Sequence, residues 1–427
     1  MYKYSRLLLL LFTALLLLMA GCDDRGRNIP TVTELEGWSV DPTDRVFSTD
    51  DGTYAWVNPP DTAEFLMQNL NERAQLAMQV YIPKVATAPL FKPVPTLLLL
   101  APQEGKDSYF RDSEILAIVE EMTATGEIQP MRIVMIGNDD YVGGNFYGNS
   151  YGGGFYDRVL GDAMIEKLEN NFPGFINDPS KLGIGGVGQG AYGAFRTTIQ
   201  NPGMYGSVSA VDGPLDFDGS TGSGGFIALL DTLMVEQTAL DSTSLSTIER
   251  DDVAAGNPVL RMFVGGSIAF SPHDTLLSYF VTAGTGKVTL LGRMQMADST
   301  TLNTSLNPAS GQILDLHFHF PFYFSSAAAT APTRHDPTWD RWMANDLDVL
   351  KNAAASDPLE SVKMWIATTP QTRFGFNDMT RSWIMTLEAD GYVAGSDSLQ
   401  VVTYEGYDDL PAQGSEYMYD LLRQILK

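Results

Sequence analysis

The sequence has few cysteines and few positive charges, and each scarcity excludes a class of protein. Cys22 is the only cysteine among the 427 residues, so no intrachain disulfide can form. The 27 Lys and Arg residues are outnumbered by 52 Asp and Glu residues, which gives a formal net charge of −25. Because such an acidic surface repels the phosphates of nucleic acid, we expect no nucleic-acid partner. We interpret the acidity as a solvated surface that keeps the protein soluble.

Long hydrophobic runs are also lacking, except for one at the start of the chain that is too short to span a membrane. It covers residues 7–19, and a helix of this length reaches about 20 Å, against about 30 Å for the hydrocarbon core of a bilayer. Lys3 and Arg6 precede the run, and Ala20-Gly21 follows it. This order is typical of a cleaved signal peptide over residues 1–21, whose removal changes the net charge to −27.

The residues before Cys22 resemble the bacterial lipobox, with Met19 in the place of the usual leucine. The resemblance implies that Cys22 is lipidated and that its lipid attaches the mature protein to a membrane. The alternative is an ordinary secretory signal followed by an unrelated cysteine. We predict a lipid-anchored protein of the bacterial cell envelope, and the sequence leaves open whether the inner or the outer membrane holds it.

Beyond the signal peptide, short apolar runs alternate with amphipathic segments. This alternation is typical of a mostly parallel sheet between layers of helices. Strands are predicted at residues 76–81, 96–100, 131–136, 182–187, 207–211, 259–264, 362–367 and 399–404. Helices are predicted at residues 113–125, 158–171, 191–200 and 379–389.

The composition along the chain suggests one large domain behind a tether. Residues 22–40 are polar and are predicted to form the tether, followed by a lead-in at 41–69 and a single domain at 70–427. Residues 265–350 break the strand–helix alternation with Ser/Thr/Ala-rich stretches and extra strand-like runs. We predict that this segment is an insertion that contains strands and lies over the carboxyl edge of the sheet.

Four stretches resemble the esterase branch of the α/β-hydrolases, which includes S-formylglutathione hydrolases and enterochelin esterases. They are Val80-Tyr81-Ile82-Pro83, residues 95–100, residues 142–150 and residues 186–193. The resemblance covers roughly residues 70–215 and returns at 358–427. It implies an α/β-hydrolase three-layer sandwich with a mostly parallel central sheet.

The position of the nucleophile departs from this family. Active members carry G-x-S-x-G between a strand and a helix, and this chain has Gly186-x-Gly188-x-Gly190 at the corresponding place. Glycine has no side-chain atom that could attack a carbonyl carbon. Glycine-rich turns also bind phosphates, but such turns follow the first strand of a βαβ unit, whereas several predicted strands precede this one.

The other catalytic positions that the resemblance implies are substituted as well. Thr372 stands where the family has its acid, and Asp408 stands where the family has its histidine. Ala101-Pro102 replaces the His-Gly of the oxyanion hole, and proline has no amide hydrogen to donate. Loss of a whole triad costs about 10⁶-fold in turnover. The sequence therefore predicts a degenerate hydrolase that binds an unidentified ligand or protein partner.

The alternative is an active carboxylic-ester hydrolase with relocated or metal-assisted catalytic residues. All four histidines, His273, His317, His319 and His335, lie in the predicted insertion. His317 and His319 alternate, so on a strand both rings point to one face, and neutral imidazoles are good zinc ligands. We name His273, His317 and His319 as the candidate zinc ligands, and predict no other cofactor.

The glycine-rich aromatic stretch at residues 137–156 lies beside the pocket in the related esterases. Pocket candidates from this resemblance are Ala101, Gln189, Tyr147 and Tyr151. Two interpretations stay open: the rings stack against a sugar or acyl ligand, or they pack the stretch against the insertion. Trp339 and Trp342, three residues apart on a predicted helix, are expected to anchor the insertion to the core.

Overall fold

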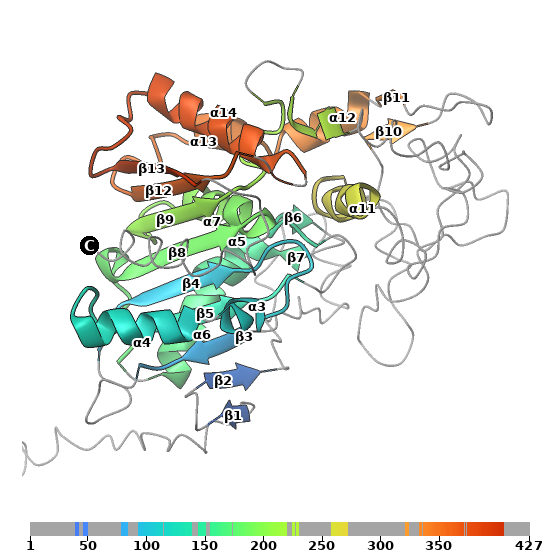
Figure 1. Cartoon of the computed structure of the whole chain (residues 1–427). Coiled ribbons are helices and arrows are strands. Elements are labelled where there is room, and N and C mark those ends of the chain that lie inside the picture. Colours follow the sequence, from blue (N-terminus) through green and yellow to red (C-terminus); the bar gives the residue numbers. More distant parts are fainter. Residues whose placement is uncertain are drawn as a thin grey trace, which may run out of the picture.

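A computed structural model describes most of the region between residues 39 and 404. The described residues are 39–41, 46–49, 78–83, 93–113, 115–138, 144–150, 154–172, 174–219, 224–226, 228–229, 258–271, 321–323, 333–334, 336–370, 372 and 374–404. Within them, a nine-stranded sheet runs in the order β1-β2-β3-β5-β4-β8-β9-β12-β13 (Figure 1). Its strands are β1 (Ser39–Asp41), β2 (Val46–Thr49), β3 (Met78–Tyr81), β4 (Thr96–Leu100), β5 (Arg132–Ile136), β8 (Leu182–Val187), β9 (Ser207–Val211), β12 (Lys363–Thr368) and β13 (Leu399–Thr403).

The centre of the sheet is parallel, and one side of it is antiparallel. Strands β5, β4, β8, β9, β12 and β13 all run in the same direction, whereas β1, β2 and β3 pair antiparallel at the β5 side. Leu100, Gly186 and Ala210 lie side by side in register on β4, β8 and β9. The loops that follow these strands therefore meet at the same carboxyl edge of the sheet.

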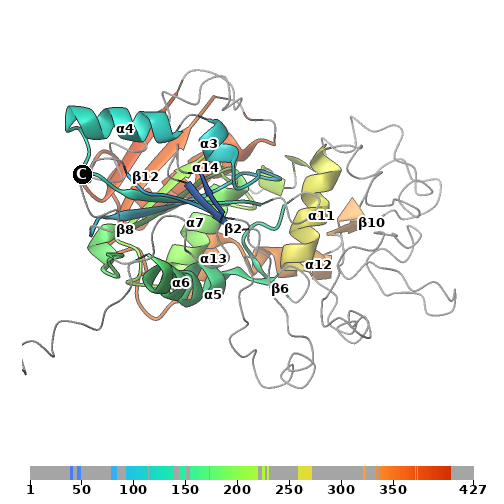
Figure 2. The same ribbon diagram turned by 90° about the horizontal axis from the view of Figure 1, so that it is seen from below.

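Helices cover both faces of the sheet and bury two separate hydrophobic clusters. Apolar residues of α3 and α4 pack on one face, and those of α6, α7 and α14 belong to the larger cluster on the other. Figure 2 shows α4 on one side of the sheet and α6 and α7 on the opposite side. The described helices are α3 (Tyr109–Asp112), α4 (Ile115–Thr125), α5 (Tyr156–Arg158), η1 (Val159–Ala163), α6 (Met164–Asn171), η2 (Pro179–Lys181), α7 (Gln189–Gln200), α11 (Pro258–Phe270), α12 (Asp336–Met343), α13 (Leu347–Ala353) and α14 (Phe376–Ala389).

Two predicted elements were wrong in kind or in continuity. Residues 259–264 were predicted to form a strand, but they lie in the 13-residue helix α11. Their run is apolar apart from Arg261 and fits a buried strand and a buried helix equally well, so periodicity alone could not separate the two. The helix predicted at 158–171 is interrupted, because Gly161 adopts non-helical angles (φ −80°, ψ −117°).

The predicted architecture is confirmed: the described part of the chain forms a three-layer α/β sandwich with a mostly parallel central sheet. The strand predictions at 96–100, 182–187 and 207–211 match β4, β8 and β9 residue for residue. The predicted insertion contains strands, since β10 (Phe322–Tyr323) pairs antiparallel with β11 (Thr333–Arg334). A further pair, β6 (Asn149–Ser150) and β7 (Gly154–Phe155), lies in the glycine-rich stretch. Among the described residues, no helix is both long enough and apolar enough to cross a bilayer.

Candidate functional site

The turn between β8 and α7 has the sharp geometry of a nucleophile elbow. Gly188 occupies it with φ 56° and ψ −122°, which side-chain-bearing residues adopt only under strain. Its amide donates a hydrogen bond of 2.9 Å to the carbonyl of Val211 on the neighbouring strand. The turn therefore brings position 188 to the carboxyl edge of the sheet.

The two flanking glycines allow the helix to approach the sheet closely. A Cβ atom on Gly190 would lie 2.0 Å from the carbonyl oxygen of Leu100, and one on Gly186 would lie 2.2 Å from the carbonyl carbon of Gly190. Both contacts are with backbone, which cannot move aside. Gly186 and Gly190 are thus required by packing, whatever the residue at position 188.

Position 188 itself has room for a side chain. A Cβ atom there would lie 3.5 Å from Cβ of Pro102 and 4.0 Å from Cε2 of Phe376. Both neighbours are apolar, and Pro102 has no amide hydrogen that could stabilise an oxyanion. The turn therefore leaves room for a small nucleophilic side chain at position 188. Neither that side chain nor an amide hydrogen at position 102 is present.

Gln189, a pocket candidate, belongs to a buried network of amide groups. Its Oε1 accepts hydrogen bonds from Nδ2 of Asn138 at 3.0 Å and from the amide of Phe146 at 3.3 Å. Oδ1 of Asn138 in turn accepts from the amide of Asn145 at 2.8 Å. The side chain of Gln189 is fully buried, so it ties the start of α7 to the glycine-rich stretch.

Ala101 and Tyr147, two further pocket candidates, contact each other within the core. The hydroxyl of Tyr147 donates to the carbonyl of Ala101 at 3.1 Å, and the ring packs so closely on α7 that a Cβ on Gly193 would lie 2.6 Å from it. Both residues are fully buried. Their pocket role stays a prediction, and Tyr151 lies outside the described residues.

The described rings of the glycine-rich stretch pack against the segment around α11, as the second of the two interpretations predicts. Phe146 contacts Phe270 with ring centroids 5.0 Å apart, and Phe270 contacts Trp342 at 5.4 Å. Nε1 of Trp342 donates to the hydroxyl of Ser271 at 3.1 Å. The anchoring role of Trp339 and Trp342 stays a prediction, which is supported by the burial of both rings and by the contact of Trp342 with Phe226 at 5.3 Å.

The structure describes the candidate acid position but not the candidate base position. Thr372 follows β12, and its Oγ1 lies 3.2 Å from Oδ1 of Asn377 and 3.4 Å from the Asn377 amide, at the start of α14. It therefore stabilises its own loop. Asp408 lies outside the described residues.

A buried carboxylate that the sequence analysis missed lies at the same edge of the sheet. Asp212 directly follows β9 and is 5% exposed, with φ 42°. Oδ1 of Asp212 accepts from the Thr368 hydroxyl at 3.0 Å, and Oδ2 accepts from the Thr369 hydroxyl at 2.6 Å. An aspartate directly after a buried strand, with two threonines after a neighbouring strand, was the available signal.

No metal centre is found in the part of the chain that the structure describes. No group of three His, Cys, Asp or Glu side chains lies close enough there to hold an ion. The candidate zinc ligands His273, His317 and His319, together with His335, lie outside the described residues, as does Cys22. Asp336, next to His335, is exposed and accepts a hydrogen bond of 2.7 Å from Arg334.

Comparison with models of known protein families, and with curated protein sequences, finds no match. Solved structures with a similar fold include a ferulic acid esterase. It is 13% identical with a TM-score of 0.47, and the match covers 84% of this chain and 93% of that chain. An S-formylglutathione hydrolase from Agrobacterium tumefaciens has 14% identity and a TM-score of 0.44, with 90% and 95% covered. MPT51 of Mycobacterium tuberculosis has 12% identity and a TM-score of 0.43, with 87% and 98% covered. At this level of identity the likeness concerns the fold alone.

Proposed function

We propose that this protein is a lipid-anchored, catalytically degenerate member of the esterase-like α/β-hydrolases that binds a ligand or a partner protein at the cell envelope. The observation that carries the proposal is the elbow turn at Gly188, which has the backbone geometry of a nucleophile elbow but no side chain. Pro102 supports it, because the residue nearest to the turn offers no amide hydrogen.

The surroundings of the turn are ordered as a binding surface requires. Gln189 is held by Asn138, and Asp212 is held by Thr368 and Thr369, so the loops at this edge are fixed by buried hydrogen bonds. A rigid edge lowers the entropy cost of binding, because its side chains and loops are already ordered before a ligand arrives. The apolar contacts of position 188 favour an uncharged part of the ligand there.

The first test is the hydrolysis of short p-nitrophenyl esters by the purified chain without residues 1–22. We expect no turnover above that of a heat-denatured sample. The variant Gly188→Ser, Thr372→Asp, Asp408→His restores a triad at the positions that the family resemblance implies, and gained activity supports the alignment. Turnover by the unmodified chain contradicts the degenerate function.

A matched control separates chemistry from backbone strain. Gly126→Ser places serine at another positive-φ glycine (φ 76°), which has no heavy atom within 4 Å of its Cβ position and lies far along the chain from the turn. It carries the same kind of strain as Gly188→Ser but should gain no activity. If both serine variants hydrolyse the ester equally, the elbow has no special role.

The alternative hydrolase with metal-assisted residues predicts a different outcome of the same assay. Turnover by the unmodified chain that a chelator abolishes and zinc restores would assign the chemistry to the histidines at 273, 317 and 319. Alanine variants of His317 and His319 then identify the ligands, because each ligand lost weakens zinc binding.

The lipid anchor is tested on the full chain in a bacterial host. Metabolic labelling with an alkyne fatty acid should label the wild-type protein, and Cys22→Ser should abolish both the label and membrane fractionation. An unlabelled protein that is released to the soluble fraction supports the ordinary secretory signal instead. Fractionation of the labelled protein on a density gradient then decides between inner and outer membrane.

A further inference from the structure

A groove opens at the amino edge of the sheet, at the opposite ends of the strands from Gly188. Its volume is about 470 Å³, within the range of about 300–1,000 Å³ of small-molecule sites. The groove crosses the amino ends of four neighbouring strands, β4, β8, β9 and β12. The first residues of these strands line it, namely Thr96, Leu182, Ser207 and Lys363. None of the catalytic positions considered above lies in it.

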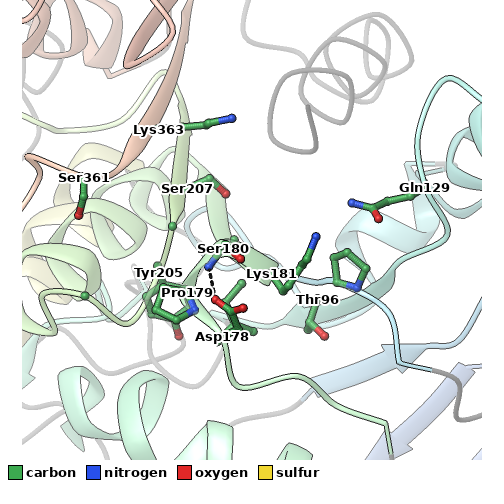
Figure 3. A pocket seen from close by; sticks show the side chains of 15 residues that line it. Thr96, Gln129, Asp178, Pro179, Ser180, Lys181, Tyr205, Ser207, Ser361 and Lys363 are labelled. Carbon is green, nitrogen blue, oxygen red and sulfur yellow. Dashed lines mark hydrogen bonds between the residues drawn. The ribbon is translucent and has the colours of Figure 1, made fainter.

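Strand register brings two lysines to this groove from distant parts of the chain. Ser207 pairs with Gly183 on one side and with Lys363 on the other, so Gly183 and Lys363 lie two strand spacings apart, about 10 Å. Lys181 precedes Gly183 by two residues, at the end of η2. Figure 3 shows the side chains of Lys181 and Lys363 reaching toward the same open space, with Gln129 facing them.

Neither lysine forms an ion pair within the described residues. Lys351 differs from them, because its Nζ lies 2.7 Å from Asp390 and 3.6 Å from Asp357. Asp178 is the single acidic residue among the described residues that line the groove, and its Oδ1 already accepts from the Ser180 amide at 2.9 Å. No ion pair within the described residues joins this carboxylate to either lysine, and two lysines against one aspartate leave the lining with an excess of one positive charge.

We propose that this groove binds a phosphate-bearing small molecule, with Lys181 and Lys363 as the charged contacts and Ser207 and Gln129 as polar contacts. A compact ammonium group binds phosphate as a point charge, and charge-assisted hydrogen bonds are about twice as strong as neutral ones. Gly183, which pairs with Ser207 in the neighbouring strand, lines the groove without a side chain. The site is independent of the proposed function at Gly188.

The test is calorimetric titration of the soluble chain without residues 1–22, at low salt, with inorganic phosphate and with glycerol 3-phosphate. We expect saturable binding of both, and about tenfold weaker binding in each of Lys181→Gln and Lys363→Gln. Lys106→Gln removes an exposed lysine outside the groove and should bind like the wild type. Absence of saturable binding, or equal weakening by Lys106→Gln, overturns the proposal.

A second arm distinguishes a soluble phosphate compound from a lipid headgroup. Vesicles of phosphatidylglycerol should not recruit the soluble chain, because its net charge is strongly negative. If the vesicles recruit the soluble chain and the double variant Lys181→Gln, Lys363→Gln is not recruited, the phosphate belongs to a lipid headgroup. Failure of both arms overturns the groove site and leaves the ester-hydrolysis test of Gly188 unaffected.

Discussion

Thr369 and Asp212 are joined by hydrogen bonds from both the hydroxyl and the amide of Thr369, and these bonds connect the ends of adjacent strands. The Thr369 hydroxyl donates to Oδ2 of Asp212 at 2.6 Å, and the Thr369 amide donates to Oδ1 at 3.0 Å. Because β9 and β12 are neighbours, this pair fixes the loop after β12 to the turn after β9, close to where α14 begins. A buried carboxylate needs such donors, since an unpaired buried charge is costly.

Thr369→Val should destabilise the protein by about 1.5–3 kcal/mol, because it removes one donor to a buried charge. Urea unfolding followed by tryptophan fluorescence measures the change. Thr403→Val, at an exposed position at the end of β13, should change stability by less than about 0.5 kcal/mol. Equal losses in the two variants would mean that the bond to Asp212 contributes nothing specific.

Gly190→Ala should prevent folding, whereas Gly188→Ala should cost only about 1–3 kcal/mol. The Cβ at position 190 would lie 2.0 Å from the Leu100 carbonyl oxygen, while the Cβ at position 188 meets nothing closer than 3.5 Å. Soluble yield and circular dichroism compare the two variants. A folded Gly190→Ala protein with wild-type stability would show that α7 does not lie this close to β4.

Acidification should stabilise the fold through Asp346, the N-cap residue of α13. Burial raises the pKa of Asp346 to about 7, although the Phe217 amide donates to its carboxylate at 2.6 Å, and Asp216 raises the pKa further. A carboxyl group with a raised pKa binds more protons in the folded than in the unfolded state between about pH 4 and pH 7. Its contribution to stability is therefore largest below about pH 4 and decreases as pH rises to about 7.

Unfolding free energies measured from pH 4 to pH 8 test this dependence. The wild type should lose stability relative to Asp346→Asn as pH rises through this range, because the carboxyl group must ionise in a buried site and the variant has no group to titrate there. Asp340→Asn removes a carboxylate at an exposed position on α12 and serves as the matched control. A constant difference between wild type and Asp346→Asn across the range would contradict the raised pKa.

Trp342→Ala should cost about 3–5 kcal/mol and loosen α11 more than the central strands. Trp342 is fully buried, and its ring contacts Phe263 and Phe270 of α11 at centroid distances of 5.6 and 5.4 Å. Hydrogen exchange of residues 258–271 should accelerate, with β8 unchanged. Val349→Ala, at a position that is 44% exposed, serves as the control and should leave exchange as in the wild type.

Local pattern was enough to identify the central strands and the glycine turn. The runs at 96–100 and 182–187 consist mostly of apolar residues and glycine, the run at 207–211 combines Val and Ala with two serines, and all three are buried along their whole length, so pattern and structure agree there. The spacing of Gly186, Gly188 and Gly190 placed the sharp turn correctly, because close packing of α7 on β4 permits no Cβ at its flanks.

Contacts between distant residues settled the rest. The segment at 258–270 is a helix whose apolar side chains pack around Trp342 and the glycine-rich stretch, and its largely apolar sequence does not encode the choice between helix and strand. Asp212 meets Thr369 across 157 positions, and Lys363 is brought beside Ser207 by register alone. Sequence patterns report local periodicity, whereas the pairing of strands sets which polar groups share an edge of the sheet.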